Sequence, residues 1–162
     1  MSFYYFDSSA LVKRYLPEAG TQWIEQLFDP MSGHILTTSQ LTLAEIAAVL
    51  GARSRAPGGL SIRQRERMLS RLLEDTNDLF MLIPVHRQII MQAVQLSQVY
   101  RLRGYDSVQL ASALAARQIL IEQFNESDLI LLAGDQDLLD TGPKVGVQTV
   151  DPAKQSLYDE SV

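Results

Sequence analysis

The chain has 162 residues, 46% of them hydrophobic, which is enough for one ordinary core and too little for two comfortable domains. It contains no cysteine, and this excludes disulfides, thiolate metal sites and cysteine nucleophiles. No basic segment precedes the first apolar run, and no apolar stretch approaches the ~18 residues of a membrane span. We therefore expect a single cytoplasmic domain over residues 1–162 that does not enter a membrane.

The net charge of -5 is unevenly distributed along the chain. Residues 51–71 carry six arginines against the single acid Glu66, whereas residues 122–162 carry nine acids against two lysines. A polyanion would approach the first region and would be repelled by the second unless cations intervened. Charge alone leaves two alternatives for the arginines from Arg53 to Arg71, a solvated helix face or a surface that binds RNA.

Strands and helices alternate through the first half of the chain. The apolar run Phe3–Phe6 predicts a short strand, and Asp7 stands at its carboxyl end with two serines behind it as possible helix caps. The turn Pro57-Gly58-Gly59 predicts an αα-hairpin. In order, the predicted elements are a strand over 3–6, helices over 8–16 and 21–28, a strand over 34–38, and helices over 41–55 and 61–75.

The second half continues this alternation. We expect strands over 79–83, 129–133 and 145–150, with helices over 86–102 and 106–123 and a short helix after Asp137. The run Leu129–Ala133 is uninterrupted and apolar, which is typical of a strand buried on both faces. Strands that alternate with helices and lack hairpin signals predict an α/β fold, a three-layer α/β/α sandwich with a central parallel sheet of about four or five strands.

Four acids fall where this fold would bring them together. Asp7 and Asp135 each follow an apolar strand, and parallel strands carry their carboxyl ends to one edge of the sheet. Glu45 and Asp106 are predicted to lie on helix faces shared with apolar residues: Leu41, Ala48, Val49 and Ala52 for Glu45, and Leu110 and Ala113 for Asp106. Because unpaired buried carboxylates are costly, such acids must be neutralised, paired or bound to a metal ion.

Each of these acids also has a purely structural explanation. Asp7 and Asp106 are acceptable helix caps, Glu45 can reach an arginine, and Asp135 suits a turn. Taken singly, each structural explanation is about as good as a functional one. Their coincidence at one sheet edge favours a shared site.

The other ligand types are sparse. The two histidines, His34 and His86, are scattered near predicted element ends and favour structural roles. An oxygen-only ligand set suits Mg²⁺ or Mn²⁺ and does not suit Zn²⁺. The further acidic stretch Glu74-Asp75-Asp78 is expected to be a solvated helix end.

The residues around the four acids resemble the acidic motifs of the PIN domain family. The segments that carry the resemblance follow in order along nearly the whole chain: Phe6–Lys13, Leu43–Glu45, Tyr105–Ala113 and Ala133–Leu138. The single-domain length is similar to that of the VapC-type toxins of toxin-antitoxin pairs. The resemblance implies a metal-dependent endoribonuclease, usually a homodimer, that acts on RNA and is held inactive by a cognate antitoxin protein.

The resemblance also implies roles for single residues. It makes the four acids catalytic, namely Asp7, Glu45, Asp106 and Asp135. Asp7 and Asp106 would hold the principal Mg²⁺, with Mn²⁺ as an alternative, and the other two would complete the site. The family commonly has Ser or Thr two residues before its fourth acid, where this chain has Ala133. We therefore expect Asp137 to supplement Asp135, directly or through a water molecule.

Two other functions fit parts of the pattern. Asp135 with Asp140 imitates the last motif of haloacid dehalogenase-type phosphatases, but that class needs a second aspartate where this chain has Ser9. A non-catalytic PIN-fold domain that binds protein is the other alternative. A binding module has no reason to retain four acids at one sheet edge, which argues against it.

A homodimer is also expected from the predicted hairpin over residues 41–75. Its apolar residues offer more surface than one small sheet face needs: Leu50, Met68, Leu69, Leu72 and Leu73.

Overall fold

The structure is a computed structural model that describes residues 2–155. In this part of the chain five strands form one sheet in the order β3-β2-β1-β4-β5, and every neighbouring pair is parallel. The strands are β1 (Phe3–Phe6), β2 (Ile35–Ser39), β3 (Phe80–Ile83), β4 (Leu129–Leu132) and β5 (Gln148–Val150). The predicted parallel α/β class is confirmed.

The α-helices of residues 2–155 connect these strands. They are α1 (Ser8–Leu11), α2 (Thr21–Gln26), α3 (Gln40–Arg55), α4 (Ile62–Asp78), α5 (Arg87–Val99), α6 (Gly104–Phe124) and α7 (Gln136–Thr141). Ser39 caps α3, and Ser61 forms a capping box with Gln64 at the start of α4. None of the helices between residues 2 and 155 combines the length with the hydrophobicity that a membrane span requires.

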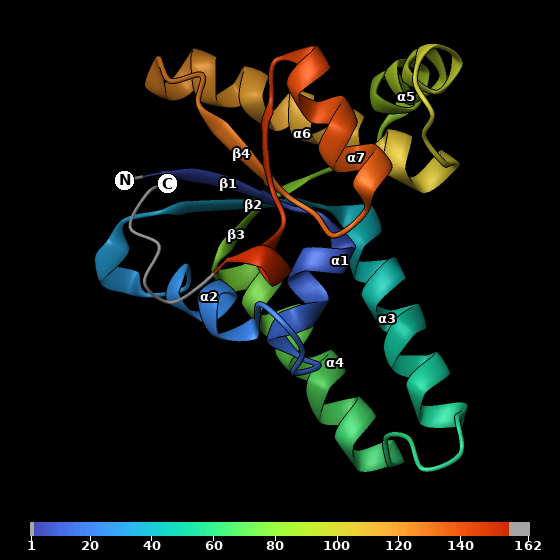
Figure 1. Ribbon diagram of the computed structural model, residues 1–162. Helices are drawn as coiled ribbons and strands as arrows, with labels where there is room; N and C mark the ends of the chain where they lie inside the picture. The colour runs from blue at the N-terminus through green and yellow to red at the C-terminus, as the bar shows by residue number, and fades with distance from the viewer. Residues whose placement is uncertain (1, 156–162) are drawn as a thin grey trace.

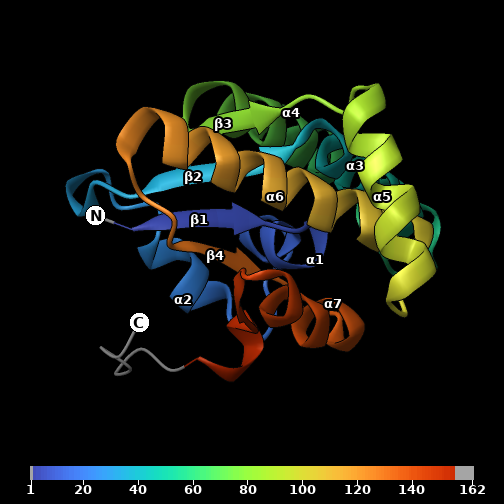
Figure 2. The same cartoon turned by 90° about the horizontal axis from the view of Figure 1, so that it is seen from above.

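Alternate side chains of β1 enter two different hydrophobic cores. Phe3 and Tyr5 pack with residues of α5, α6 and α7, whereas Tyr4 and Phe6 pack with residues of α1 to α4. Figures 1 and 2 show these two helical layers on opposite faces of the sheet, with α6 lying across it. The three-layer sandwich is confirmed, and its central strand β1 is buried throughout.

Glycine closes the hairpin between α3 and α4. Gly58 has a φ of +68°, and a Cβ on Gly59 would lie 1.8 Å from the carbonyl oxygen of Arg53. That oxygen accepts a hydrogen bond from the backbone of Leu60, so no side chain fits between the two segments. The predicted turn is confirmed with this physical basis.

The apolar stripe of the hairpin is mostly used inside the chain. Leu50 and Leu72 are fully buried, and Met68 and Leu69 pack against the same core. Of the five residues only Leu73 is exposed, at 51%. The expectation that this stripe carries surplus apolar surface was wrong, because the sheet and the α1–α2 layer already cover it.

Two predicted helix boundaries were wrong. The first helix over 8–16 is a short α1 followed by a 3₁₀ turn over Val12–Arg14. The helix over 86–102 ends at Val99, because Tyr100 turns to extended backbone. Gly104 does not end that helix but begins α6, since it lacks the left-handed conformation of a glycine C-cap.

At the acidic end of α4, Glu74 and Asp78 are exposed as expected, but Asp75 is not. The Asp75 side chain is only 12% exposed and accepts hydrogen bonds from Arg14 Nε at 2.7 Å and from the Tyr15 hydroxyl at 3.0 Å. Arg14 also stacks on the Phe28 ring, with 3.8 Å between the guanidinium carbon and the ring centroid. Asp75 therefore ties α4 to the segment after α1.

Candidate active site

Asp7 lies at the carboxyl end of β1 and is almost fully buried. Its backbone N–H donates to the carbonyl of Leu132 at 3.0 Å, which places it beside the end of β4. Its Oδ2 accepts hydrogen bonds from the backbone N–H of Ser9 at 3.1 Å and from the Ser9 hydroxyl at 2.5 Å. The same hydroxyl oxygen accepts from the Gly134 N–H at 2.8 Å, so Ser9 joins the two strand ends.

Glu45 reaches the same edge of the sheet from α3. Its Oε2 accepts a 2.6 Å hydrogen bond from the side-chain amide of Gln109 on α6. That amide also donates to the Thr42 hydroxyl at 2.9 Å, and its oxygen accepts from the Tyr5 hydroxyl at 2.7 Å. Gln109 is fully buried, as are Tyr5 and Thr42, so this network fixes the partly buried Glu45 relative to β1.

Asp106 enters the site from the first turn of α6. Its Oδ2 is buried and has no hydrogen-bond partner within residues 2–155. Burial, together with the charges of Asp135 and Asp7, raises the pKa of Asp106 above its ordinary value. A buried carboxylate oxygen without a partner is uncommon and needs an explanation.

The four carboxylates repel one another. Burial raises the pKa of Asp7, and the nearby charge of Glu45 adds to this shift. Burial likewise raises the pKa of Glu45, and Asp106 adds to it. No lysine or arginine of the described chain forms an ion pair with any of the four. We call this set the acidic cluster: Asp7, Glu45, Asp106 and Asp135.

Figure 1 shows why these residues meet, since α1, α3 and α7 all begin beside the carboxyl end of β1. Asp135 begins α7 and accepts a cap bond from the backbone of Leu138 at 3.1 Å. Asp135 therefore has the structural role that was considered for it, and its charge also raises the pKa of Asp106. Asp137 is engaged elsewhere, since its Oδ2 lies 3.5 Å from Nε of Arg101.

The donor set of the acidic cluster fits a hard divalent cation. Within residues 2–155, no three Asp, Glu, His or Cys side chains are close enough to make a ready-made metal cage. Mg²⁺ does not need one, because it keeps several waters and is usually held by one or two carboxylates together with substrate phosphate. The unpartnered Asp106 Oδ2 offers a free oxygen ligand of the kind this binding requires.

The structure corrects two expectations about these helices. The buried face of α3 is formed by Thr42, Ile46 and Leu50, whereas Ala48 and Val49 are exposed, so Glu45 lies at the edge of that face. Asp106 is not the helix cap considered as an alternative, because Arg103 occupies that position. The predicted sharing of a face with Leu110 and Ala113 is confirmed, since both are fully buried.

The sequence analysis missed the polar residues that support the acids. Gln109 follows Asp106 by three positions, so both lie on one side of α6. A glutamine among small apolar residues on a buried helix was the available signal. Ser9 was considered as a helix cap and as a departure from the phosphatase motif, and its bond to Gly134 depends on a strand pairing that the sequence does not reveal.

These features define a class of protein, an α/β/α domain with oxygen ligands gathered at the carboxyl edge of a parallel sheet. Within this class, the family model of the PIN domain matches residues 4–134. The chain belongs to the PIN domain family, whose members are generally nucleases.

Several solved structures have the same fold. A toxin-antitoxin complex from Klebsiella pneumoniae is similar with a TM-score of 0.60 and 19% identity, over 94% of this chain and 98% of that one. VapBC2 from Rickettsia felis, bound to a DNA fragment from its promoter, has a TM-score of 0.59 and 12% identity, over 92% and 99%. FitAB bound to an IR36 DNA fragment has a TM-score of 0.57 and 14% identity, over 96% and 99%. A comparison with curated proteins finds no match.

Proposed function

We propose that the chain is a metal-dependent endoribonuclease that hydrolyses RNA phosphodiester bonds. The observation that carries this proposal is the unpartnered, buried Oδ2 of Asp106 within a cluster of four carboxylates that no cation of the described chain pairs. Such an arrangement is costly for folding unless a bound cation compensates it. Membership of a family of nucleases supports the same function.

The residues have distinct roles in this proposal. Asp7 and Asp106 would hold Mg²⁺ or Mn²⁺, while Glu45 and Asp135 would orient water molecules around the site. A bound divalent ion would supply charge neutralisation at the phosphate and a water molecule of lowered pKa. Gln109 would keep the Glu45 carboxylate turned toward the cluster, and no side-chain nucleophile is needed. Asp137 would assist Asp135 only after leaving its exposed ion pair with Arg101.

A cleavage assay tests the proposal. RNA is incubated with the protein in Mg²⁺ or Mn²⁺, with and without chelator, and compared with Asp7→Asn, Glu45→Gln and Asp106→Asn. We expect cleavage that is lost with chelator and abolished by the aspartate substitutions. Retained cleavage in both aspartate variants would contradict the metal-ligand assignment. Release of phosphate from a monoester with RNA left intact would favour the phosphatase alternative, and no activity at all would favour a binding domain.

We further propose that this ribonuclease acts in the cytoplasm as the toxin of a toxin-antitoxin pair. Support comes from the fold, which it shares with the toxin-antitoxin complex from Klebsiella pneumoniae and with VapBC2. The partner would be a cognate antitoxin protein. Co-expression of the neighbouring open reading frame should suppress both growth arrest and RNA cleavage, and persistence of both effects would contradict the toxin role.

We also propose that the chain forms a homodimer, but the apolar residues of the α3–α4 hairpin are not its interface. Four exposed apolar side chains lie instead on α5: Ile90, Met91, Val94 and Val99. Light scattering should show a dimer, since an interface of about 1,600 Å² normally survives dilution to tens of micromolar. A monomer at that concentration would contradict this part.

A further inference from the structure

The short connection between α5 and α6 is anchored to the core, although its charged side chains are exposed. Tyr100 and Leu102 pack against the hydrophobic core on one side, whereas Arg101 and Arg103 are exposed. The backbone is held at both ends, by Tyr100 N–H donating to Leu96 at 2.8 Å and by the Arg103 carbonyl accepting from Ser107 at 2.9 Å. Two guanidinium groups are therefore mounted on a fixed backbone.

These two arginines flank the acidic cluster. Arg103 directly precedes α6, and its charge acts on Asp106 three residues later. Arg101 lies 3.5 Å from Asp137 in the first turn of α7, with 93% of its side chain exposed. An ion pair this exposed is weak, so Arg101 can exchange Asp137 for a phosphate at little cost. Guanidinium groups recognise phosphate through paired N–H donors.

Tyr105 follows Arg103 by two positions and directly precedes Asp106. Its side chain is 66% exposed, and no hydrogen bond to its hydroxyl is found within residues 2–155. The other tyrosines of that range are buried or partly buried: Tyr4, Tyr5, Tyr15 and Tyr100. Core packing therefore does not explain this ring. An exposed aromatic ring next to cationic groups is the usual platform on which a base of a single strand stacks.

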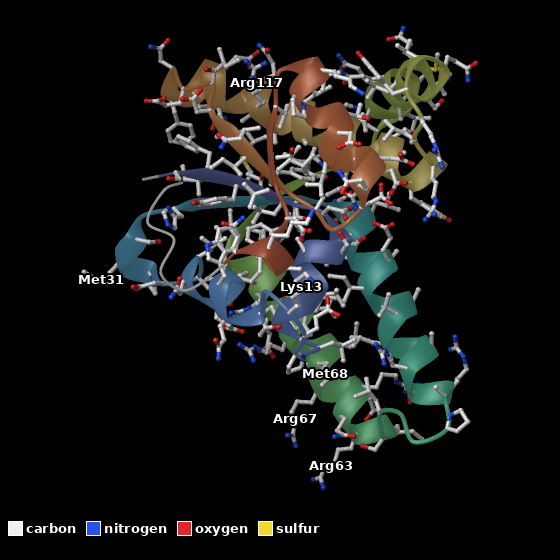
Figure 3. The ribbon with its side chains drawn as sticks, in the orientation of Figure 1. Lys13, Met31, Arg63, Arg67, Met68 and Arg117 are labelled. Carbon is white, nitrogen blue, oxygen red and sulfur yellow. The ribbon has the colours of Figure 1, made fainter. Side chains whose placement is uncertain are left out.

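The larger set of arginines, on the α3–α4 hairpin, does not supply the positive charge beside the acidic cluster. Figure 3 shows Arg63 and Arg67 pointing into solvent from the end of α4 that lies farthest from α1 and the acidic cluster. Arg14 and Arg71 lie within ion-pair distance of Asp75 instead. Six of the fourteen lysines and arginines of the sequence fall on the hairpin, but the positive charges beside the acids come from the α5–α6 connection.

We propose that Arg101, Arg103 and Tyr105 form a binding strip for single-stranded RNA. The two arginines bind phosphates that flank the cleaved bond, and Tyr105 stacks on a neighbouring base. This inference rests on the proposed ribonuclease function and names the part of the substrate that lies outside the acidic cluster. Stacking needs an unpaired base, so the strip selects single strands over duplexes.

Binding measured without cleavage tests the strip separately from the chemistry. Fluorescence anisotropy of a labelled single-stranded oligoribonucleotide is followed in chelator at two salt concentrations. Tyr105→Ala should weaken binding about 5- to 150-fold, whereas Tyr105→Phe, which keeps the ring, should bind like the wild type. Arg101→Ala/Arg103→Ala should lower the log-log salt slope by about 1.4, at about 0.7 for each phosphate that is no longer neutralised.

Arg63→Ala/Arg67→Ala is the matched control, because it removes the same charge from α4, and its salt slope should equal that of the wild type. Equal affinity of Tyr105→Ala and wild type, or an equal decrease of slope in the two arginine pairs, would overturn the proposal. So would equal binding of duplex RNA, or no measurable RNA binding by the wild type. If the chain binds RNA through Tyr105 but cleaves none, the binding strip is supported and the proposed nuclease activity is contradicted. If the chain cleaves RNA but Tyr105→Ala binds it like the wild type, the nuclease activity is supported and the strip is contradicted.

Discussion

The side-chain amide of Gln109 donates to Glu45 at 2.6 Å while its oxygen accepts from the Tyr5 hydroxyl at 2.7 Å. Glu45 on α3 is thus fixed by a residue of α6, which is itself fixed to β1. Because α6 also carries Asp106, the placement of two acids depends on one helix. A single uncharged residue therefore couples the fold to the site.

Replacing Gln109 by leucine tests this coupling. Gln109→Leu nearly keeps the side-chain volume but removes the acceptor of the buried Tyr5 hydroxyl, while the Thr42 hydroxyl keeps its bond with Thr38. We expect the free energy of unfolding to fall by about 1 to 3 kcal/mol, since a buried polar group loses its hydrogen bond. Metal-dependent cleavage should fall further than stability predicts, because Glu45 is no longer held. Urea denaturation and a cleavage assay measure the two effects.

Gln118→Leu is the control for that substitution. Gln118 lies on the same helix and donates to Glu122 at 2.8 Å, but at the surface. Its effect on unfolding should stay within about 0.5 kcal/mol. Equal losses of unfolding free energy and of cleavage in the two variants would show that the buried network contributes no more than a surface hydrogen bond.

The pKa of Asp106 leads to a prediction about pH. Burial, then the charges of Asp135 and Asp7, raise its pKa above the ordinary value of 3.8. The folded chain therefore binds this proton more tightly than the unfolded chain does. Without metal, stability from this group is full below pH 3.8 and is lost as the pH rises through the raised pKa. Asp106→Asn removes that loss, so it should be more stable than the wild type at neutral pH.

The comparison is made by urea denaturation in chelator at neutral and at acid pH. The advantage of Asp106→Asn should shrink as the pH falls toward the ordinary value of 3.8. An advantage that grows on acidification, or a variant less stable than the wild type at neutral pH, would contradict the assigned repulsion.

Divalent ions should stabilise the folded wild type. An ion that binds only the folded chain adds about 2.7 kcal/mol at a hundredfold excess over its Kd. Asp7→Asn should lose most of this gain, because it removes one of the two proposed ligands. Asp128→Asn is the control, since Asp128 precedes β4 at the opposite end of the strand from the acidic cluster. Thermal unfolding with and without Mn²⁺ gives the comparison, and an equal gain in both variants would contradict the assignment.

The layout of the site could be predicted because it follows from the topology. Asp7 and Asp135 end buried apolar runs, and neighbouring parallel strands place such ends side by side. Asp106 could be placed because Leu110 and Ala113 mark a clear buried side of α6. In each case a local pattern combined with one general rule was sufficient.

The face of α3 could not be predicted in this way. Its first eleven residues, Gln40–Leu50, are apolar almost all round, so the pattern gives no contrast between sides. The buried side is decided by Thr42, whose hydroxyl lies 2.9 Å from that of Thr38 in β2. Polar contacts between elements leave no periodic signal. For the same reason the sequence did not reveal the partners of Asp75. One of them, Arg14, is 61 positions away in the chain.

Arg14 provides the last prediction, because its pairing with Asp75 joins α4 to the segment after α1. Arg14→Ala leaves the largely buried Asp75 carboxylate without its closest cation and also removes the stacking on Phe28. We expect a loss of about 3 to 5 kcal/mol in the free energy of unfolding, as for other buried pairs that lose one partner. Arg65→Ala, which breaks an exposed pair with Glu66 at 3.7 Å, should cost less than about 1 kcal/mol. Similar losses in urea denaturation of the two variants would mean that Asp75 is solvated after all.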